Sequence, residues 1–269
     1  MTRFTLPLAA AVALAIALPA VGLTLADLEP AKGDRIAYRV SEDTKMSFEG
    51  TPATVSAHGS GTQTIEVVAT SKGGGTTAYI VLSSQEMKRT RGQNGSEETT
   101  TSYSLEVCRA SPTGLYTDAN ISTENGEDSS VDVGRWVLNV RLPCEPGTSW
   151  RVGRLSYKDG FTMRPESQAV AYETVEVPAG TFEKCLKVAS TCPNGIEGHL
   201  EQEGQTFEIV SGELAVTSWY APKVGLTKEV VSTTLRLRPE GQDQAAILRI
   251  DTASTTELTD YKLAQRPPK

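Results

Sequence analysis

Three side chains that can bind metal ions alternate along one short segment. Glu197, His199 and Glu201 occupy every second position, and Glu203 follows them. On a β-strand they would share one face, and carboxylate oxygens with imidazole nitrogens suit Zn²⁺, Mn²⁺ or Ca²⁺. Strand positions i and i+2 lie about 6.6 Å apart at ~3.3 Å per residue, so at most two neighbours converge on one ion. We therefore interpret Glu197, His199 and Glu201 as a solvent-facing row, weak candidates at most, and predict no metal site.

The four cysteines are the second group with chemical potential, because four cysteines in an oxidising compartment allow three disulfide pairings. Cys185 and Cys192 follow one another along one expected strand, roughly 23 Å apart at ~3.3 Å per residue, which is too far to bridge. Cys108 and Cys144 each end an expected strand just before a proline-containing turn. We predict a disulfide between Cys108 and Cys144. Neither a CxxC pair nor a cysteine–histidine spacing supports a redox or zinc motif.

Residues of the common catalytic motifs are sparse. The chain has two histidines, His58 and His199, so general acid–base catalysis through imidazole has few sites. His58 precedes Gly59-Ser60-Gly61, which lacks the Gly-x-Ser-x-Gly spacing and the following helix of a nucleophile elbow. We interpret that segment as a flexible turn. The sequence predicts no cofactor and no enzymatic activity.

The N-terminal segment has the pattern of an export signal. One arginine precedes an uncharged run, residues 4–26, which a proline and a glycine interrupt and which ends in small residues. A basic start, an apolar centre and small residues at the cleavage point define a signal peptide. The run also meets the roughly 20 residues needed to span a bilayer, so a retained anchor is the alternative. We predict a signal peptide at residues 1–26 and an exported protein, either periplasmic or secreted.

Charge argues against polyanionic partners. The formal net charge is −7, and the short basic cluster at residues 88–91 adjoins a loop-like stretch of Gly, Gln, Asn and Ser. Binding to a phosphate backbone needs dense Lys and Arg. We predict no nucleic-acid partner, and no stable membrane span after cleavage of the signal.

The elements that must position these residues are strands. Apolar and polar residues alternate nearly throughout, bounded by Gly, Pro, Asn and Asp, and no stretch shows convincing helical spacing. The pattern predicts strands at residues 35–41, 62–70, 76–83, 99–110, 114–118, 131–141, 149–157, 167–177, 181–190, 206–210, 214–220, 226–237 and 246–261. Turn chemistry agrees at residues 72–75, 178–180, 193–195 and 239–241, where Gly, Pro and Asn gather.

Long strands joined by short turns predict an all-β fold, a long-stranded antiparallel meander. Such a sheet must close on itself or be covered, so a curved sheet, a half-barrel or a sandwich is expected. We predict one all-β domain at residues 27–269. Two similar halves, about 33–143 and 144–262, are the candidate internal repeat.

Two hairpin segments and a closing strand are more specific. They read ETVEVPAGTFEKCLKV (173–188), WYAPKVGLTKE (219–229) and ELTDYK (257–262). In this order they resemble a group of exported bacterial β-proteins of uncharacterised function. The openings GDRIAYRV (33–40) and PCEPGTSW (143–150) resemble that group too, although Ile36 stands where the group usually has Trp. The resemblance implies a scaffold and transfers no catalytic residue.

Strand number and length give a more distant architectural likeness to the LolA-like half-barrels, which carry lipid in bacterial envelopes. This likeness is associational. It favours a non-enzymatic protein that binds a hydrophobic or lipid-like ligand on a concave sheet face. The alternative is a structural or protein-interaction module that meets another envelope protein. An enzyme is the third class, because strands could bring together carboxylates such as Glu173, Glu176 or Asp260 unseen.

Overall fold

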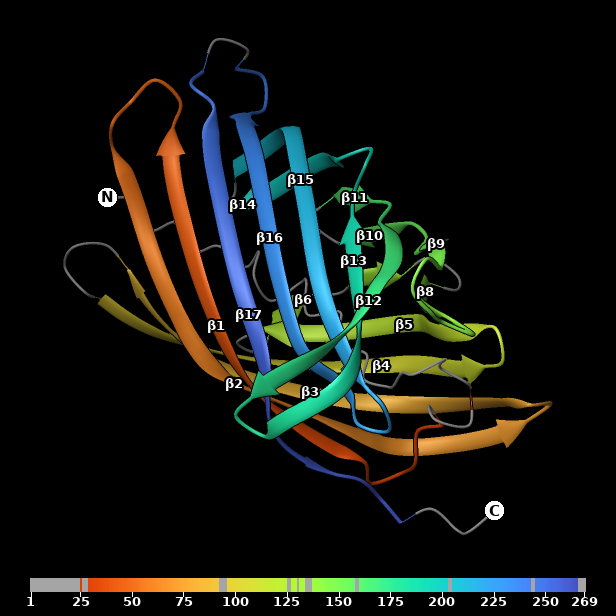
Figure 1. The fold of residues 1–269 in the computed structure, drawn as a ribbon. Helices are drawn as coiled ribbons and strands as arrows, with labels where there is room; N and C mark the ends of the chain where they lie inside the picture. The colour runs from red at the N-terminus through yellow and green to blue at the C-terminus, as the bar shows by residue number, and fades with distance from the viewer. Residues whose placement is uncertain are drawn as a thin grey trace.

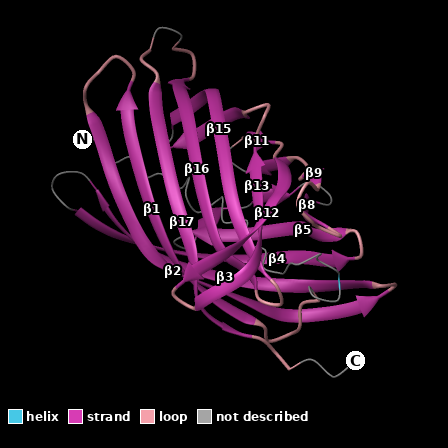
Figure 2. Ribbon diagram, in the orientation of Figure 1, coloured by secondary structure: helices cyan, strands magenta, loops and turns pink. Residues whose placement is uncertain are grey.

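The computed structural model describes residues 25, 29–91, 96–124, 127–129, 131–133, 137–157, 160–202, 205–242 and 245–265. Every assigned element is a strand (Figure 2), which confirms the all-β antiparallel prediction. Of the predicted signal peptide, only Leu25 lies within the described residues. No helix in the described ranges is long and apolar enough to cross a membrane.

Ten long strands carry most of the sheet. They are β1 (Arg35–Phe48), β2 (Thr54–Gly73), β3 (Thr76–Arg91), β4 (Ser96–Ser111), β5 (Gly114–Glu124), β12 (Glu166–Val177), β13 (Gly180–Thr191), β15 (Gln205–Ala221), β16 (Gly225–Pro239) and β17 (Leu248–Lys262). The short strands are β6 (Glu127–Ser129), β7 (Val131–Val133), β8 (Val137–Arg141), β9 (Ser149–Arg151), β10 (Leu155–Tyr157), β11 (Phe161–Met163) and β14 (Ile196–Gln202).

The strands follow one another around a strongly curved sheet (Figure 1). β5, β4, β3, β2, β1, β17, β16 and β15 pair in that order. β15 continues through β14, β11 and β10 to β7, so the circuit returns toward β5. A branch leaves β15 through β13 and β12 to β9. Curvature of this extent matches the predicted curved sheet or half-barrel.

All four predicted turns fall between strands, because Gly and Pro supply the backbone angles that tight reversals need. Three local predictions are wrong. The two strands expected over 206–210 and 214–220 are one continuous strand, β15. Residues 58–61, expected as a flexible turn, lie inside β2. The single strand expected over 149–157 is broken into β9 and β10, since Gly153 between them adopts φ +119°.

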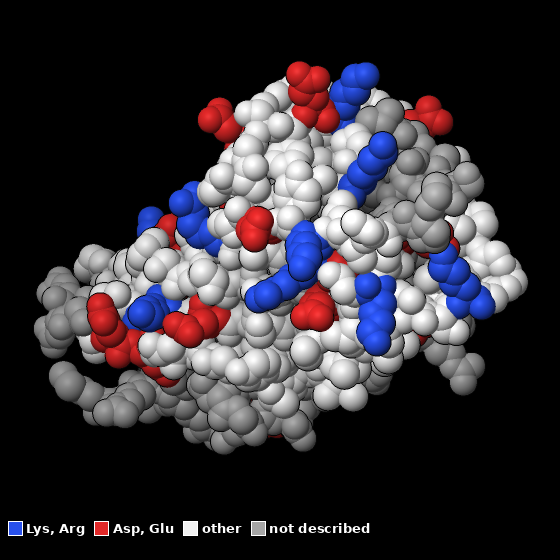
Figure 3. Space-filling model, turned by 90° about the horizontal axis from the view of Figure 1, so that it is seen from below, with Lys and Arg blue, Asp and Glu red and all other residues white. Residues whose placement is uncertain are grey.

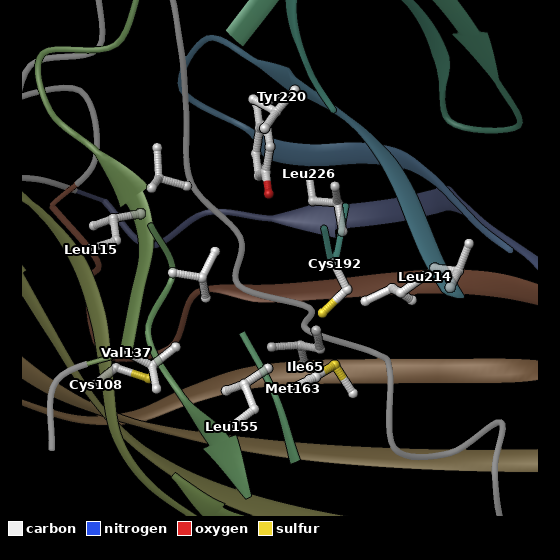
Figure 4. Packing of buried hydrophobic residues seen from close by; sticks show 14 of the residues in the cluster. Ile65, Cys108, Leu115, Val137, Leu155, Met163, Cys192, Leu214, Tyr220 and Leu226 are labelled. Atoms are coloured by element: carbon white, nitrogen blue, oxygen red, sulfur yellow. The ribbon is translucent and has the colours of Figure 1, made fainter. Parts of the chain in front are cut away.

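The core lies against the inner face of the sheet, where apolar residues of many strands form one cluster. Figure 4 shows Ile65 of β2, Leu155 of β10 and Met163 of β11 among its members. We call the inner faces of β13, β15, β16, β17 and β1 the apolar wall. Its buried side chains are Tyr38, Val40, Leu186, Val188, Leu214, Tyr220, Leu226, Val231, Leu235, Leu237, Ile250 and Leu258.

Candidate functional site

The inner face changes character where the circuit passes from β1 to β2. Cross-strand partners share a face of a sheet, and three partner rows run from the core onto β4. In the first row, Tyr38 of β1 pairs with Gln63, which pairs with Gln85 and then Ser102. The second begins at Ile65 and passes to Ser83, Ser104 and Ser122. A third row, starting at Val67, reaches Glu106 and Asn120.

We call the polar side chains of these rows the polar floor. Its members are Gln63, Ser83, Gln85, Ser102, Ser104, Glu106, Asn120 and Ser122. Gln63, Ser83 and Glu106 are buried, whereas the other five are half-buried. The concave face of this protein therefore joins an apolar wall to a polar floor.

Several oxygen atoms on and beside the floor lack hydrogen-bond partners among the described residues. They are Gln63 Oε1 on β2, Asp118 Oδ1 and Asn120 Oδ1 on β5, and Asn139 Oδ1 on the adjoining β8. Buried acceptors in native proteins are almost always satisfied by protein, water or ligand. Open acceptors therefore mark separate positions on β2, β5 and β8 where water or another polar molecule can bind.

Glu106 lies in the middle of this polar region. Burial raises the pKa of its carboxyl to about 7. Its nearest recorded partner is the Cys108 thiol, with Sγ 3.9 Å from Oε2. Burial also raises the pKa of Cys108, and the Glu106 and Asp118 carboxylates add to that rise. Both acidic side chains therefore disfavour ionisation of the Cys108 thiol.

A buried ion pair extends the polar surface toward the far end of the same strands. Arg89 Nε of β3 lies 3.4 Å from Glu42 Oε1 of β1, and Arg89 donates to Thr100 Oγ1 at 3.2 Å. To reach Glu42, the Arg89 side chain crosses β2 at Gly59, where an added Cβ would come within 3.3 Å of Arg89 Cγ. The glycines of residues 58–61 thus make room for side chains of β3.

The wall carries one comparable carboxyl, Glu229 of β16. Burial raises its pKa to about 7, and a hydrogen bond from Ser218 Oγ at 2.7 Å opposes part of that rise. The described surroundings of Glu229 and Glu106 share no residue.

The predicted disulfide between Cys108 and Cys144 is not formed. Cys108, Cys144, Cys185 and Cys192 are all buried free thiols. Cys108 is on β4 with Thr117 Oγ1 3.8 Å from its sulfur, whereas Cys144 lies beyond β8 and acts electrostatically on Tyr220 of the wall. The spacing argument failed because strand ends adjacent to prolines need not meet. These thiols pack as small apolar side chains.

The predicted row Glu197, His199 and Glu201 lies on the exposed face of β14, with Ile196 and Leu200 buried on the other face. No group of three His, Cys, Asp or Glu side chains among the described residues is arranged to hold a metal ion. The side chain of Glu203 lies outside the described residues.

The motif segments meet on the outer face of the wall. Glu173 accepts hydrogen bonds from Lys187 Nζ at 3.0 Å and from Trp219 Nε1 at 2.8 Å. Glu257 accepts from Lys228 Nζ at 3.0 Å and from Arg39 at 2.7 Å. Trp219 pairs with Lys228 in register, so we call these six residues the outer ladder. The motifs build a scaffold, as their resemblance implies.

Charges of both signs are interspersed on the face shown in Figure 3. This distribution agrees with the net charge of −7 and with the absence of a dense basic cluster in the sequence.

Sequence reasoning missed the polar floor. The segment of β4 reads SEETTTSYSLEVCRAS, and its alternation is plain. Hydrophobicity would place Tyr103, Leu105 and Val107 inward. They are exposed instead, because Glu106 and Cys108 share the inward face with their partners Val81 and Tyr79 on β3. The cross-strand register, rather than the composition of one strand, was the missing signal.

Comparisons with known proteins add a likeness of shape. No family model and no curated protein match the chain. Among solved structures, a Bacteroides fragilis protein classed as exported, with a YmcC-like fold, is 14% identical, with 92% of this chain and 100% of that chain covered and a TM-score of 0.41. A Parabacteroides distasonis protein classed as a lipoprotein is 15% identical, with coverages of 87% and 97% and a TM-score of 0.34. DynF from the dynemicin biosynthesis pathway of Micromonospora chersina is 10% identical, with coverages of 93% and 87% and a TM-score of 0.30.

Proposed function

We propose that this is an exported, non-enzymatic binding protein that takes a hydrophobic or lipid-like ligand on the concave face of its sheet. The export signal in the sequence supports the location. The observation that carries the proposal is the division of the concave face into an apolar wall and a polar floor with open acceptors. An amphipathic molecule presents the same two surfaces.

Wall and floor adjoin directly. Tyr38 of the wall and Gln63 of the floor are cross-strand partners on β1 and β2, and Ile36 and Ile65 are partners two residues along. A ligand with its polar end on the floor would therefore have apolar side chains within one strand spacing, about 4.8 Å. Ligand sites of this kind are mostly apolar, with a few placed polar groups that fix orientation.

The experiment is native mass spectrometry of protein purified from an exported fraction without detergent and then incubated with an envelope lipid extract. Two adjacent positions on β4 give a matched pair. Ser104→Trp fills the floor, whereas Leu105→Trp adds the same side chain on the opposite, exposed face. We expect a discrete mass excess on the wild type and on Leu105→Trp, and none on Ser104→Trp. A bare wild-type mass, or equal loading of both variants, contradicts the proposal.

The alternative function, a protein-interaction module of the envelope, has one observation in its favour. Leu82, Leu105 and Ile121 are cross-strand partners on β3, β4 and β5, and all three are exposed on the outer face. Tyr103 and Val107 of β4 flank them and are exposed as well. We call these five residues the outer patch. It contains no charge, so it suits a partner whose contacting surface is apolar and uncharged.

Charge insertion tests this alternative. Leu105→Glu places a carboxylate in the outer patch, and Thr99→Glu places one at an exposed position of the same strand outside the patch. Cross-linking of the exported protein in intact cells would show an adduct for the wild type and Thr99→Glu that Leu105→Glu loses. An adduct of unchanged yield in Leu105→Glu rules out the patch as the contact.

A further inference from the structure

Polar side chains on three neighbouring strands gather around Glu106 of the floor. We call the group the acidic cluster, and its members are Tyr79 of β3, Glu106 and Cys108 of β4, and Asp118 and Asn120 of β5. Glu106 and Asn120 are direct cross-strand partners, so their Cβ atoms lie about 4.5–5.5 Å apart. The open polar atoms of Gln63, Asn139 and Trp150 lie on or beside β2, β8 and β9, outside this cluster.

Three members of the cluster present oxygens that can accept hydrogen bonds. Asp118, the extra residue of a β-bulge in β5, and Asn120 each have an Oδ1 atom without a hydrogen-bond partner among the described residues. Glu106 is 6% exposed, and the contact recorded for its carboxyl is with the Cys108 thiol, a weak donor 3.9 Å from Oε2. The cluster therefore needs a group that brings several donors to one place.

Tyr79 bounds the cluster on the β3 side, where it is the cross-strand partner of Cys108. It is 3% exposed, and its Oη atom has no hydrogen-bond partner in the described ranges. Burial raises the pKa of Tyr79 well above 10, and the thiol and the two carboxyls of the cluster add to that rise. The hydroxyl therefore lies close to those groups. A buried hydroxyl without a partner is a second, independent sign of a bound polar molecule, and its oxygen can accept as well as donate.

The carboxyl of Glu106 differs from its acidic neighbours, because no described Lys or Arg pairs with it. Burial raises the pKa of Asp118, and the positive charge of Arg109 opposes that rise. Glu42, the next buried carboxyl of the concave face, pairs with Arg89 at 3.4 Å. Burial is the one recorded influence on Glu106. Because buried carboxylates in proteins are normally paired, a bound cation would complete this site.

A primary ammonium group fits the acidic cluster better than a hydroxyl or an anion. An ammonium brings three N–H donors, no acceptor and one positive charge. A single hydroxyl brings one donor, so it leaves most of the acceptors open and Glu106 without a cation. A phosphate or carboxylate brings further acceptors and like charge to Glu106.

We infer that the carboxyls of Glu106 and Asp118, together with Asn120 Oδ1, bind the primary ammonium group of a cationic amphiphile. This inference rests on the function proposed above and names the polar end of its ligand. The apolar part has a path toward the wall, because Val81 and Val67 continue the cross-strand row from Glu106 through β3 to β2, and both are buried.

Four probes that share an octyl chain test the inference on the full mature protein at about pH 8. They are octylammonium, octyltrimethylammonium, octanol and octyl phosphate, each below its critical micelle concentration or solubility limit. Isothermal titration calorimetry gives the dissociation constants. We expect octylammonium to bind about tenfold or more tightly than each of the others, which corresponds to about 1.4 kcal/mol.

The other outcomes separate this inference from the proposed function. Octyltrimethylammonium carries the charge without N–H donors, so equal binding of it would show attraction to an acidic surface only and overturns the inference. Equal or tighter binding of octanol or octyl phosphate also overturns the inference, although it leaves the proposed function standing. No binding of any probe overturns both.

Competition with protons gives a second readout. The titratable groups that face Glu106 are Tyr79 on β3, Cys108 on β4 and Asp118 on β5, and burial raises the pKa of Tyr79 and Cys108 away from neutrality. Burial raises the pKa of Glu106 to about 7, so below that pH an ammonium must displace a proton. We expect octylammonium affinity to rise about tenfold from about pH 6 to about pH 8, over which the amine stays protonated. An affinity that does not change with pH overturns the role of Glu106.

Variants locate the contact. Glu106→Gln removes the carboxylate with little change of shape, and Glu66→Gln removes the same charge from an exposed position on the outer face of β2. We expect Glu106→Gln to weaken octylammonium about tenfold at about pH 8 and to abolish the pH dependence, whereas Glu66→Gln changes neither. Asn120→Leu, at a half-buried position, should weaken it about fivefold through one lost hydrogen bond and guards against a folding defect in Glu106→Gln. Wild-type affinity in a folded Glu106→Gln or Asn120→Leu protein overturns the assignment.

Discussion

The wall and the floor belong to one sheet, and in both of them apolar and polar side chains alternate along the strands. Apolar side chains face inward on the wall, whereas they face outward on the floor. On the wall, apolar side chains such as Leu235 and Leu258 point inward and the outer ladder of charges faces solvent. On the floor, Ser104 and Glu106 point inward while Leu82 and Leu105 are exposed outside. The wall stabilises the fold, and the floor gives up part of that stability to present polar groups inside and an apolar face outside.

Packing explains the residues of the wall but not those of the floor, and this contrast supports the proposed binding role of the floor. A buried apolar residue stabilises the fold by about 1.5–3 kcal/mol, so its presence on the wall needs no other explanation. Open acceptors such as Gln63 Oε1 and Asn120 Oδ1 contribute no such stabilisation and cost free energy when left unpaired. Positions that cost stability without a structural return are the expected places of binding.

Truncation of one leucine in each region should give the largest difference in stability between them. Leu258 of the wall is fully buried, so Leu258→Ala should lower the free energy of unfolding by about 2–5 kcal/mol. Leu105 of the outer patch is 39% exposed, and Leu105→Ala should change the free energy of unfolding by less than about 1 kcal/mol. Urea unfolding followed by tryptophan fluorescence measures both. Equal losses would mean that the outer patch is covered in solution.

The pH dependence of stability sharpens the comparison, because Glu106 on the floor and Glu229 on the wall both have a pKa raised from 4.5 to about 7 by burial. The native protein then binds more protons than the unfolded chain between these values. The part of the free energy of unfolding that these two carboxyls contribute is fully present below about pH 4.5 and is lost as pH rises through about 7. At about 1.4 kcal/mol per pKa unit, the shift from 4.5 to about 7 means that each carboxyl accounts for at most roughly 3.5 kcal/mol.

We expect Glu106→Gln and Glu229→Gln each to flatten this fall, measured by urea unfolding across a pH series. The two carboxyls differ in one respect. A ligand on the floor should alter the profile that depends on Glu106 and spare the part that depends on Glu229. If neither variant changes the slope, the buried carboxyls are solvated in solution and the contrast between the two regions fails.

Two glycines at the end of the floor give a smaller effect. A Cβ on Gly61 would overlap the backbone oxygen of Glu86, whereas a Cβ on Gly59 would meet only side-chain atoms of Met87 and Arg89 at 3.1 and 3.3 Å. Gly61→Ala should therefore destabilise the protein by about 1–3 kcal/mol. Gly59→Ala should cost less, since flexible side chains can move. Thermal unfolding compares them, and a reversed order would show that Arg89 and Met87 do not cross β2 as described.

The sequence predicted features that depend on local chemistry. Turns such as Pro178-Ala179-Gly180 fell between strands because Gly and Pro restrict or free the backbone locally. Residues 58–61 were misjudged, because glycine suits both a flexible turn and a crowded strand, and only the side chains of β3 decide between them. The floor and the unpaired cysteines depend on which strands meet and in what register. That information is distributed over distant parts of the chain.

The outer ladder gives the smallest expected effect and the clearest contrast in salt dependence. Glu257 is the less exposed of the two ladder carboxylates, with 19% of its side chain exposed against 39% for Glu173, and it pairs with Arg39 and Lys228. Glu257→Gln should cost about 0.2–1 kcal/mol, as half-exposed ion pairs do. In about 1 M salt, where the Debye length is near 3 Å, most of this cost should disappear. For Leu105→Ala in the apolar outer patch, the loss in free energy of unfolding should instead grow with salt, because excluded salts such as sulfate strengthen apolar burial. A salt-insensitive loss of about 2 kcal/mol for Glu257→Gln would instead place this carboxylate in the core of the wall.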